Sequence, residues 1–307
     1  MTNRQVVPGS WHAWMVYIRP KTWGVAVAPV AAALALAFAE IGGLNIGVAC
    51  ATLSMAVLMQ IITNMQNDRG YTQRKAETGN RKGLPRATAN GWLTMKQARI
   101  GLWAAVAAGA LNTALLILVG GKTFLLIGVA SILAAYAYMG GPKPIAYTPF
   151  GEIVVLLFFG LTAVCGTYYL QAGGLSVNAV LLGVGLGAVA AAVLAVNNWR
   201  DREHDRSVGR RTLAVVAGEQ TFSILFSAML FAPFLVTLVM VVRTPELWPV
   251  LTTLVLLGEV TRLRRELHSL RGLALNETLF ATVMLEVKFA FLFAFCVGGA
   301  VLFRGLT

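Results

Sequence analysis

The chain has 307 residues, of which 57% are hydrophobic and only 12% are charged, and its mean hydropathy is +0.71. This composition excludes an ordinary soluble domain and indicates an integral membrane protein. The net charge is +12. Because the basic residues do not alternate with exposed aromatic residues, we expect attraction to anionic lipid headgroups and no nucleic-acid partner.

Apolar windows long enough to cross a lipid bilayer follow one another along the chain. They predict an all-α integral membrane protein with about nine transmembrane helices, and we expect a single transmembrane domain over 1–307. The polar start through Lys21 leads straight into a full-length window, so no cleavable signal peptide is expected. The three cysteines show no metal-ligand or disulfide spacing. The windows are 22–40, 45–65, 98–120, 123–140, 151–172, 176–197, 220–242, 246–262 and 284–304.

The Lys and Arg residues are distributed unevenly between the two sides of these windows. Of the 25, only Lys122, Arg243 and Arg304 fall on one side, and Lys288 falls inside the last window. The others lie in the N-terminal segment, in the loops after the second, fourth, sixth and eighth windows, or beside them. Because positive residues mark the cytoplasmic side, we predict a multi-pass protein of the cell inner (plasma) membrane. Its N-terminus and its polar loops, at about 64–97 and 197–219, are expected in the cytoplasm.

The polar segment after the sixth window carries an oxygen ligand at every fourth residue: Asn197, Asp201 and Asp205. Residues four apart on a helix lie above one another, so these side chains would form one column. Mg²⁺ prefers oxygen ligands and is usually shared between one or two carboxylates and the phosphates of a substrate. The spacing therefore predicts a magnesium site for a diphosphate at the membrane edge.

A shorter version of this pattern follows the second window, where Asn64 and Asp68 are again four residues apart. If the two sets face one another, they would hold a diphosphate through shared metal ions. Two plainer interpretations stay open. Asp201 and Asp205 would then be solvated carboxylates that pair with neighbouring arginines, and Asn64 and Asp68 would belong to a capped helix end.

From residue 197 to residue 215 the chain reads NNWRDREHDRSVGRRTLAV. This run resembles the second aspartate-rich motif of the UbiA superfamily of membrane prenyltransferases, and it is most similar to the 1,4-dihydroxy-2-naphthoate branch. Three further blocks agree with that branch: RPKT at 19–22, GE at 151–152 leading to FFG at 158–160, and AVCGTYY at 163–169. The similarity runs from about residue 11 to the last window.

The resemblance implies a bundle of nine transmembrane helices around a central cavity. It places the aspartate motifs on cytoplasmic loops between helices two and three and between helices six and seven, where the windows also place them. The implied reaction transfers a long isoprenoid from its diphosphate to an aromatic acceptor and uses Mg²⁺. In this branch the acceptor, 1,4-dihydroxy-2-naphthoate, loses its carboxylate and becomes demethylmenaquinone.

The first motif departs from the family pattern. In the family, a second aspartate follows three or four residues after the position of Asp68, whereas this chain has Tyr71 and Thr72 there. Glu77 is the candidate that would complete the set. The departure leaves open a weaker or lost metal site, a changed donor, or a member without activity.

The resemblance also assigns roles to individual residues. Metal ions that bridge carboxylates and phosphate oxygens offset the charge that builds up on the leaving diphosphate, so the expected catalytic residues are Asp68, Asp201 and Asp205. The expected ligands of two Mg²⁺ ions are Asn64, Asp68, Glu77, Asn197, Asp201 and Asp205. The candidates for direct contact with the diphosphate are basic residues, for which a purely topological role is the alternative: Arg19, Lys21, Arg86, Lys143 and Arg200.

Aromatic residues of the fifth window are the predicted lining of a substrate cavity, where their π-faces would stabilise an allylic cation: Phe158, Phe159, Tyr168 and Tyr169. Helix packing or interfacial anchoring is the alternative role of these side chains. Two other functions stay open for the chain. One is transfer to a different acceptor, 4-hydroxybenzoate or a tetrapyrrole. The other is non-catalytic lipid binding or transport, which would call for broken helices or acids near the bilayer midplane.

Overall fold

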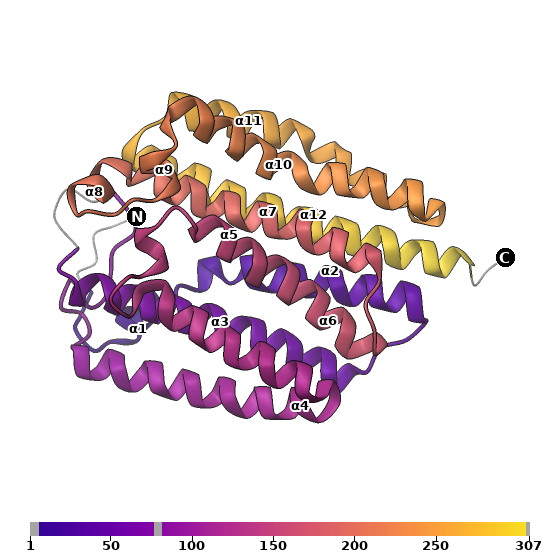
Figure 1. Ribbon diagram of the computed structural model, residues 1–307, viewed down its shortest axis with the longest axis horizontal. Helices are drawn as coiled ribbons and strands as arrows, with labels where there is room; N and C mark the ends of the chain where they lie inside the picture. Colours follow the sequence, from indigo (N-terminus) through magenta and orange to yellow (C-terminus); the bar gives the residue numbers. More distant parts are fainter. Residues whose placement is uncertain (1–5, 77–81, 305–307) are drawn as a thin grey trace.

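The computed structural model describes residues 6–76 and 82–304, and every regular element among them is a helix. Figure 1 shows the long helices side by side along the longest axis of the molecule, with α8 at one end and the last turns of α12 at the other. The elements are α1 (Trp11–Ile18), η1 (Pro20–Thr22), α2 (Gly24–Ile41), α3 (Ile46–Gln73), α4 (Met95–Met139), η2 (Ile145–Tyr147), α5 (Gly151–Val155), η3 (Leu156–Thr162), α6 (Ala163–Ala172), α7 (Val177–Arg200), α8 (Arg202–Ser207), α9 (Leu213–Val216), α10 (Gly218–Arg243), η4 (Pro245–Leu256), α11 (Leu257–Ser269), η5 (Gly272–Ala274) and α12 (Leu275–Arg304).

Helix α4 is 45 residues long but reverses its direction at Gly121, whose φ of 59° and ψ of −148° are non-helical. Glycine adopts such a conformation without steric cost. A Cβ added to Gly128 would lie 2.6 Å from the Thr113 side chain, whereas a straight helix would separate these residues by about 22 Å. The two halves therefore form a helical hairpin (Figure 1), and they match the predicted windows 98–120 and 123–140.

All the predicted windows lie on helices over nearly their whole length, so the all-α membrane architecture is confirmed. Seven of the described helices are long and apolar enough to cross a membrane, with α4 counted once. The eighth window is divided between η4, a 12-residue 3₁₀ helix with Pro249 inside it, and the 13-residue α11. The ninth helix begins at Leu275, earlier than the predicted residue 284.

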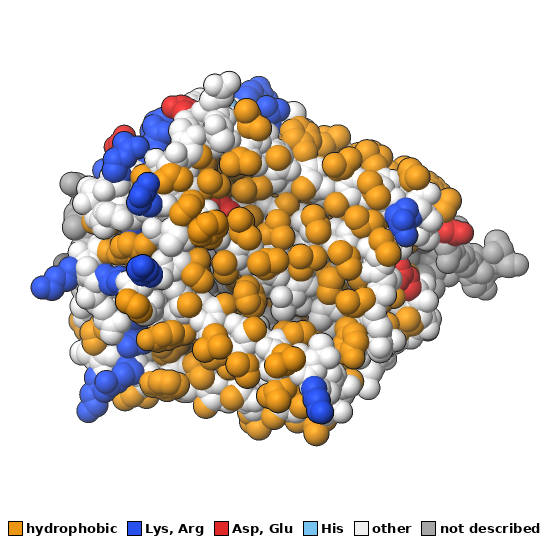
Figure 2. All heavy atoms as spheres, viewed as in Figure 1, with side chains coloured by type: hydrophobic (Ala, Val, Ile, Leu, Met, Phe, Trp, Pro, Cys, Tyr) orange, Lys and Arg blue, Asp and Glu red, His pale blue; other side chains and the backbone are white. Residues whose placement is uncertain are grey.

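Two helices continue past the windows into the polar motifs. Helix α3 ends at Gln73 and α7 ends at Arg200, whereas the windows end at residues 65 and 197. Asn64 and Asp68 therefore lie on the last turns of a helix, because the ladder of backbone hydrogen bonds continues after the apolar composition has ended. In Figure 2, Lys and Arg side chains gather at the end of the molecule where α8 lies, and hydrophobic side chains cover the middle.

Glycines bring the π-helix η3 unusually close to α7. A Cβ added to Gly160 would lie 2.3 Å from the carbonyl oxygen of Gly183 and 2.4 Å from the Cα of Gly187. Small residues allow helix backbones to approach in this way inside a membrane. The contact fixes the position of η3, and of the short helix α5 before it, along α7.

Candidate active site

A cavity of about 300 Å³ lies between α2, α3, α4, η3 and α7. Most of its wall is apolar, with residues such as Val25, Met55, Leu116, Phe124 and Leu194. Its polar residues come mainly from the ends of α3 and α7 and from the segments that follow these helices: Asn64, Asn67, Arg86, Asn197, Asn198 and Arg210. The cavity therefore combines a long apolar wall with a cationic, amide-rich end.

The second motif keeps its helical spacing through a bend. Helix α7 ends at Arg200, Asp201 has φ −98° and ψ 7°, and α8 begins at the next residue. The backbone N–H of Asp205 still donates to the Asp201 carbonyl, at 2.8 Å. The two aspartates therefore lie one turn apart, as the sequence predicted.

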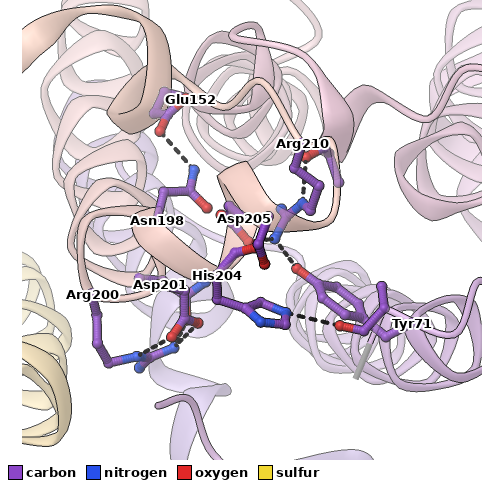
Figure 3. Close-up of polar contacts among 12 residues, drawn as sticks. Tyr71, Glu152, Asn198, Arg200, Asp201, His204, Asp205 and Arg210 are labelled. Atoms are coloured by element: carbon purple, nitrogen blue, oxygen red, sulfur yellow. Dashed lines mark hydrogen bonds and ion pairs between the residues drawn. The ribbon is translucent and has the colours of Figure 1, made fainter. Parts of the chain in front are cut away.

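Each of these aspartates is paired with an arginine (Figure 3). Arg200 donates to Asp201 Oδ1 at 3.2 Å and to Oδ2 at 2.7 Å. Arg210 Nη1 donates to Asp205 Oδ1 at 2.5 Å. All four side chains are buried, so these ion pairs are shielded from water.

Asp205 has one carboxylate oxygen available for a cation. The residue is 0% exposed, and within the described residues its Oδ2 has no hydrogen-bond partner. Burial raises the pKa of the Asp205 carboxyl above its ordinary value, while Arg210 opposes the rise and Asp201 adds to it. A buried anionic oxygen without a donor is unfavourable unless a cation binds to it, so this atom fits a hard metal ion.

Arg200 is held inside the protein by three partners. Besides Asp201, its guanidinium donates to Asn197 Oδ1 at 2.6 Å and to Asn276 Oδ1 at 2.8 Å. The predicted metal-ligand oxygen of Asn197 is therefore engaged by Arg200. Because these contacts connect α7 with the start of α12, Arg200 stabilises the bend, and its side chain does not line the cavity.

The first motif uses its aspartate differently. Asp68 is 0% exposed, and its carboxylate accepts hydrogen bonds from the Ala87 N–H at 2.8 Å, the Thr88 N–H at 3.0 Å and the Thr88 hydroxyl at 2.6 Å. Asp68 therefore holds the turn that begins at Arg86. Asn64 donates to the Ile18 carbonyl at 3.1 Å and the Thr22 hydroxyl at 3.0 Å.

Carboxylates that could bind a second metal are scarce in this region. Glu77 lies outside the described residues, and among 6–76 and 82–304 no group of three or more His, Cys, Asp or Glu side chains is arranged to hold a metal ion. Three residues of the cavity wall carry a buried amide oxygen that has no hydrogen-bond partner within the described part of the chain: Gln60, Asn67 and Asn198. Of these, Asn67 lies next to Asp68 in the first motif.

Tyr71, one of the two positions where the family pattern led us to expect a second acid, contacts two arginine side chains. The guanidinium carbon of Arg86 lies 3.6 Å from the Tyr71 ring centroid, and that of Arg210 lies 5.0 Å from it. Arg210 also donates to the Tyr71 hydroxyl (Figure 3). All three residues line the cavity. The Tyr71 ring therefore holds the positive charges of Arg86 and Arg210 at the polar end of the cavity.

The two motifs are tied to each other directly. Besides the contact between Arg210 and Tyr71, the His204 Nε2 forms a hydrogen bond of 2.8 Å with the Ala76 carbonyl (Figure 3). Asn67, Tyr71 and Arg210 were not among the predicted site residues. Two features of the sequence could have indicated Tyr71 and Arg210: the tyrosine at a position where an acid was expected, and an arginine five residues after Asp205.

The other predicted residues divide between the cavity and its surroundings. Phe158 and Phe159 line the cavity, and Arg19 and Arg86 do so as well. Lys21 and Lys143 are exposed and do not belong to the wall.

The two tyrosines of α6 also lie outside the wall. The Tyr168 hydroxyl donates to Glu40 Oε2 at 2.5 Å, at the end of α2, and the Tyr169 ring stacks on Phe124 with centroids 6.2 Å apart. Helix α6 directs both rings into packing contacts, because its neighbours α2 and α4 offer them a polar partner and an aromatic face.

Comparison with known proteins identifies the family. The model of the UbiA prenyltransferase family matches residues 26–271. This chain belongs to the UbiA prenyltransferase family. The 1,4-dihydroxy-2-naphthoate octaprenyltransferase of Haemophilus influenzae is 33% identical over 255 residues, which is 81% of this chain and 83% of that protein. The enzyme of the same name from Escherichia coli is 36% identical over 71% of this chain and 72% of its own.

Solved structures of UbiA homologues share the fold. A homologue from Archaeoglobus fulgidus bound to GPP and Mg²⁺ aligns with a TM-score of 0.70 at 14% identity, over 94% of this chain and 99% of that one. The same homologue bound to DMAPP and Mg²⁺ aligns with a TM-score of 0.68. This UbiA-family protein is therefore a multi-pass membrane prenyltransferase, and the predicted helical bundle is confirmed.

Proposed function

We propose that this prenyltransferase transfers a polyprenyl group from polyprenyl diphosphate to 1,4-dihydroxy-2-naphthoate, with loss of the acceptor carboxylate as carbon dioxide. The products are diphosphate and demethylmenaquinol, the reduced form of demethylmenaquinone. The observation that supports this most strongly is the cavity, whose apolar wall suits an isoprenoid and whose polar end is lined by Arg86 and Arg210. Arg210 is paired with the buried Asp205. The names of the relatives that share a third of their residues with this chain support the naphthoate acceptor.

The diphosphate would be bound by fixed positive charge. Arg86 and Arg210 are already stacked against Tyr71, so their guanidinium groups lose little freedom when they bind phosphate oxygens. Asp68 contributes indirectly, because it holds the amides of Ala87 and Thr88 beside Arg86. We therefore assign to Asp68 the positioning of Arg86.

The buried oxygen atoms are suitable ligands for Mg²⁺. Asp205 Oδ2 and Asn67 Oδ1 are buried acceptors without partners among the described residues, and they would hold the ion together with substrate phosphates. Asp201 lies one turn before Asp205 and stays a predicted ligand, as does Asn197. Bound Mg²⁺ would supply positive charge that stabilises the departing diphosphate. Glu77 also stays a predicted ligand.

The apolar wall would protect the allylic cation from water. Phe158 and Phe159 border the cavity on η3, and their π-faces can stabilise positive charge. Because the wall is hydrocarbon over most of its area, water is excluded until the aromatic carbon attacks. The basic end of the bundle (Figure 2) is proposed to face the cytoplasm, where both substrates would enter from the same side.

The test uses purified protein in detergent with Mg²⁺, a long-chain polyprenyl diphosphate and 1,4-dihydroxy-2-naphthoate, with 4-hydroxybenzoate in parallel. We expect prenylated naphthoquinol and carbon dioxide, and loss of product when EDTA removes the metal. If only 4-hydroxybenzoate is prenylated, the proposed acceptor is wrong, but the protein is still an aromatic prenyltransferase. Folded protein that forms no product with either acceptor would contradict the proposal.

A further inference from the structure

A buried polar pair, Glu152 and Asn198, is not used by the diphosphate chemistry. Glu152 lies on α5 and is 2% exposed, and Asn198 lies on the last turns of α7 and is 3% exposed. Asn198 Nδ2 donates to Glu152 Oε1 at 2.9 Å. This hydrogen bond joins residues 46 positions apart, at the place where α5 packs against α7.

Both side chains keep a second oxygen without a donor. Within the described residues, Glu152 Oε2 and Asn198 Oδ1 are buried and have no hydrogen-bond partner. Burying an acceptor without a donor is unfavourable, and the penalty is larger for a carboxylate. Two such oxygens beside each other fit a ligand that brings hydrogen-bond donors.

The location of the pair connects it with the reaction. Asn198 lines the cavity, next to Asn197, and its hydrogen bond connects Glu152, which is not itself a wall residue, to the cavity. Figure 3 shows Asn198 between Glu152 and Asp205. The wall beside the pair is apolar and contains Val155, Phe158 and Leu194. A flat, hydroxylated ring suits this combination, whereas a phosphate group would meet two acceptor oxygens, one of them on a carboxylate.

The backbone holds the pair in place. The close contact of Gly160 with Gly183 and Gly187 fixes η3 against α7, and α5 carries Glu152 two turns before Gly160. The segment from Leu156 to Thr162 is a π-helix, a distortion that is frequent at functional sites. Glu152 therefore reaches Asn198 through rigid helices and not through a loop.

We propose that Asn198 Oδ1 and Glu152 Oε2 bind the aromatic acceptor by accepting hydrogen bonds from its hydroxyl groups. The inference rests on the proposed function and names the residues that recognise its second substrate. The hydroxyls of 1,4-dihydroxy-2-naphthoate are the donors, and the ring lies along the apolar wall. This arrangement holds the ring between the pair and the end of the cavity where the diphosphate is bound.

The test measures acceptor binding and transfer in Glu152→Gln and Asn198→Ala. Glutamine keeps the size of the side chain but replaces an acceptor oxygen by an N–H donor. We expect the Kd and KM for 1,4-dihydroxy-2-naphthoate to rise about tenfold, as for a lost hydrogen bond to a charged group. The KM for polyprenyl diphosphate and the binding of Mg²⁺-pyrophosphate should stay unchanged, which also shows that the variants fold.

Glu286→Gln is the matched control. Glu286 is also a buried carboxyl, and within the described residues neither of its oxygens has a hydrogen-bond partner. Unlike Glu152, it has no hydrogen bond to a described residue of the cavity wall. Its replacement should change the acceptor Kd by less than about twofold. Titration with 1,4-dimethoxy-2-naphthoate, which lacks the hydroxyl donors, completes a double-mutant-type cycle in which one change is made in the protein and the other in the ligand. It should bind the wild-type protein about tenfold more weakly than the dihydroxy acid, and that difference should shrink in both site variants.

The outcomes separate this inference from the proposed function. Wild-type protein that binds the naphthoate but does not prenylate it would overturn the reaction and leave the binding site intact. An unchanged Kd and KM for the acceptor in both variants, with transfer intact, would overturn the inference alone. Equal effects of Glu152→Gln and Glu286→Gln would also overturn it, and so would wild-type protein that binds no hydroxylated aromatic.

Discussion

The two polar motifs begin alike and end in different chemistry. Each has an asparagine on the last turns of a long apolar helix and an aspartate four residues later. In the first motif both oxygens of Asp68 accept hydrogen bonds from the turn at 87–88. In the second, the equivalent Asp201 is paired with Arg200, and the next aspartate, Asp205, keeps one buried oxygen without a hydrogen-bond partner within the described residues. The same spacing therefore yields an anchor for a turn in one place and an ion pair beside a candidate metal ligand in the other. The segments that pack against each helix decide the difference.

Asp205→Asn should have the largest effect. The change removes the charge of the candidate metal ligand and weakens its ion pair with Arg210. We expect kcat/KM to fall about 10³-fold, in line with the loss of one electrostatic stabiliser in a dry site. Transfer assays over a range of Mg²⁺ concentrations measure it, with thermal unfolding in detergent as the check of folding. Near wild-type activity would remove Asp205 from the metal site.

Asp68→Asn should act mainly through the turn that carries Arg86. An amide N–H would face backbone donors, and the lost charge-assisted hydrogen bonds should lower stability by about 2 kcal/mol. We expect a lower unfolding temperature and a higher KM for polyprenyl diphosphate, with little change in the Mg²⁺ concentration for half-maximal rate. A large shift in that Mg²⁺ concentration, at unchanged stability, would make Asp68 a metal ligand like Asp205.

Tyr71→Phe and Tyr71→Asp change the first motif in opposite directions. Phenylalanine keeps the ring beneath Arg86 but loses the hydroxyl that Arg210 contacts, so the KM for polyprenyl diphosphate should rise about fivefold. Aspartate would add a carboxylate and make the first motif resemble the second. We expect Tyr71→Asp to bind more Mn²⁺ per protein in the presence of pyrophosphate, as counted by electron paramagnetic resonance. An identical Mn²⁺ count in wild-type and Tyr71→Asp protein would show that Tyr71 does not limit metal binding.

Lys21→Ala and Lys143→Ala should have the smallest effects. Both side chains are exposed and lie outside the cavity wall, so each change should alter the KM for polyprenyl diphosphate by less than about twofold. A larger rise for either variant would mean that the diphosphate site extends past Arg86 and Arg210.

Much of the fold was predictable because a membrane-spanning helix leaves a local signal in composition. That signal ends with the apolar residues, and so the polar extension of α3 to Gln73 and the early start of α12 were missed. Within the site, the relative position of Asp201 and Asp205 was predictable, because it depends on a local four-residue spacing that the bend between α7 and α8 preserves. Contacts between distant residues leave no such trace. Asp68 meets amides about twenty residues away, and Glu152 meets Asn198 at a separation of 46.

The reversal at Gly121 decides on which side of the bilayer each later helix begins. A 45-residue helix without it would count as one crossing, and every later segment would then exchange sides of the bilayer. The second motif would lie on the opposite face from the first, and Arg210 would have no path to Tyr71. A single glycine with a positive φ thus keeps both halves of the candidate site on the same side of the bilayer.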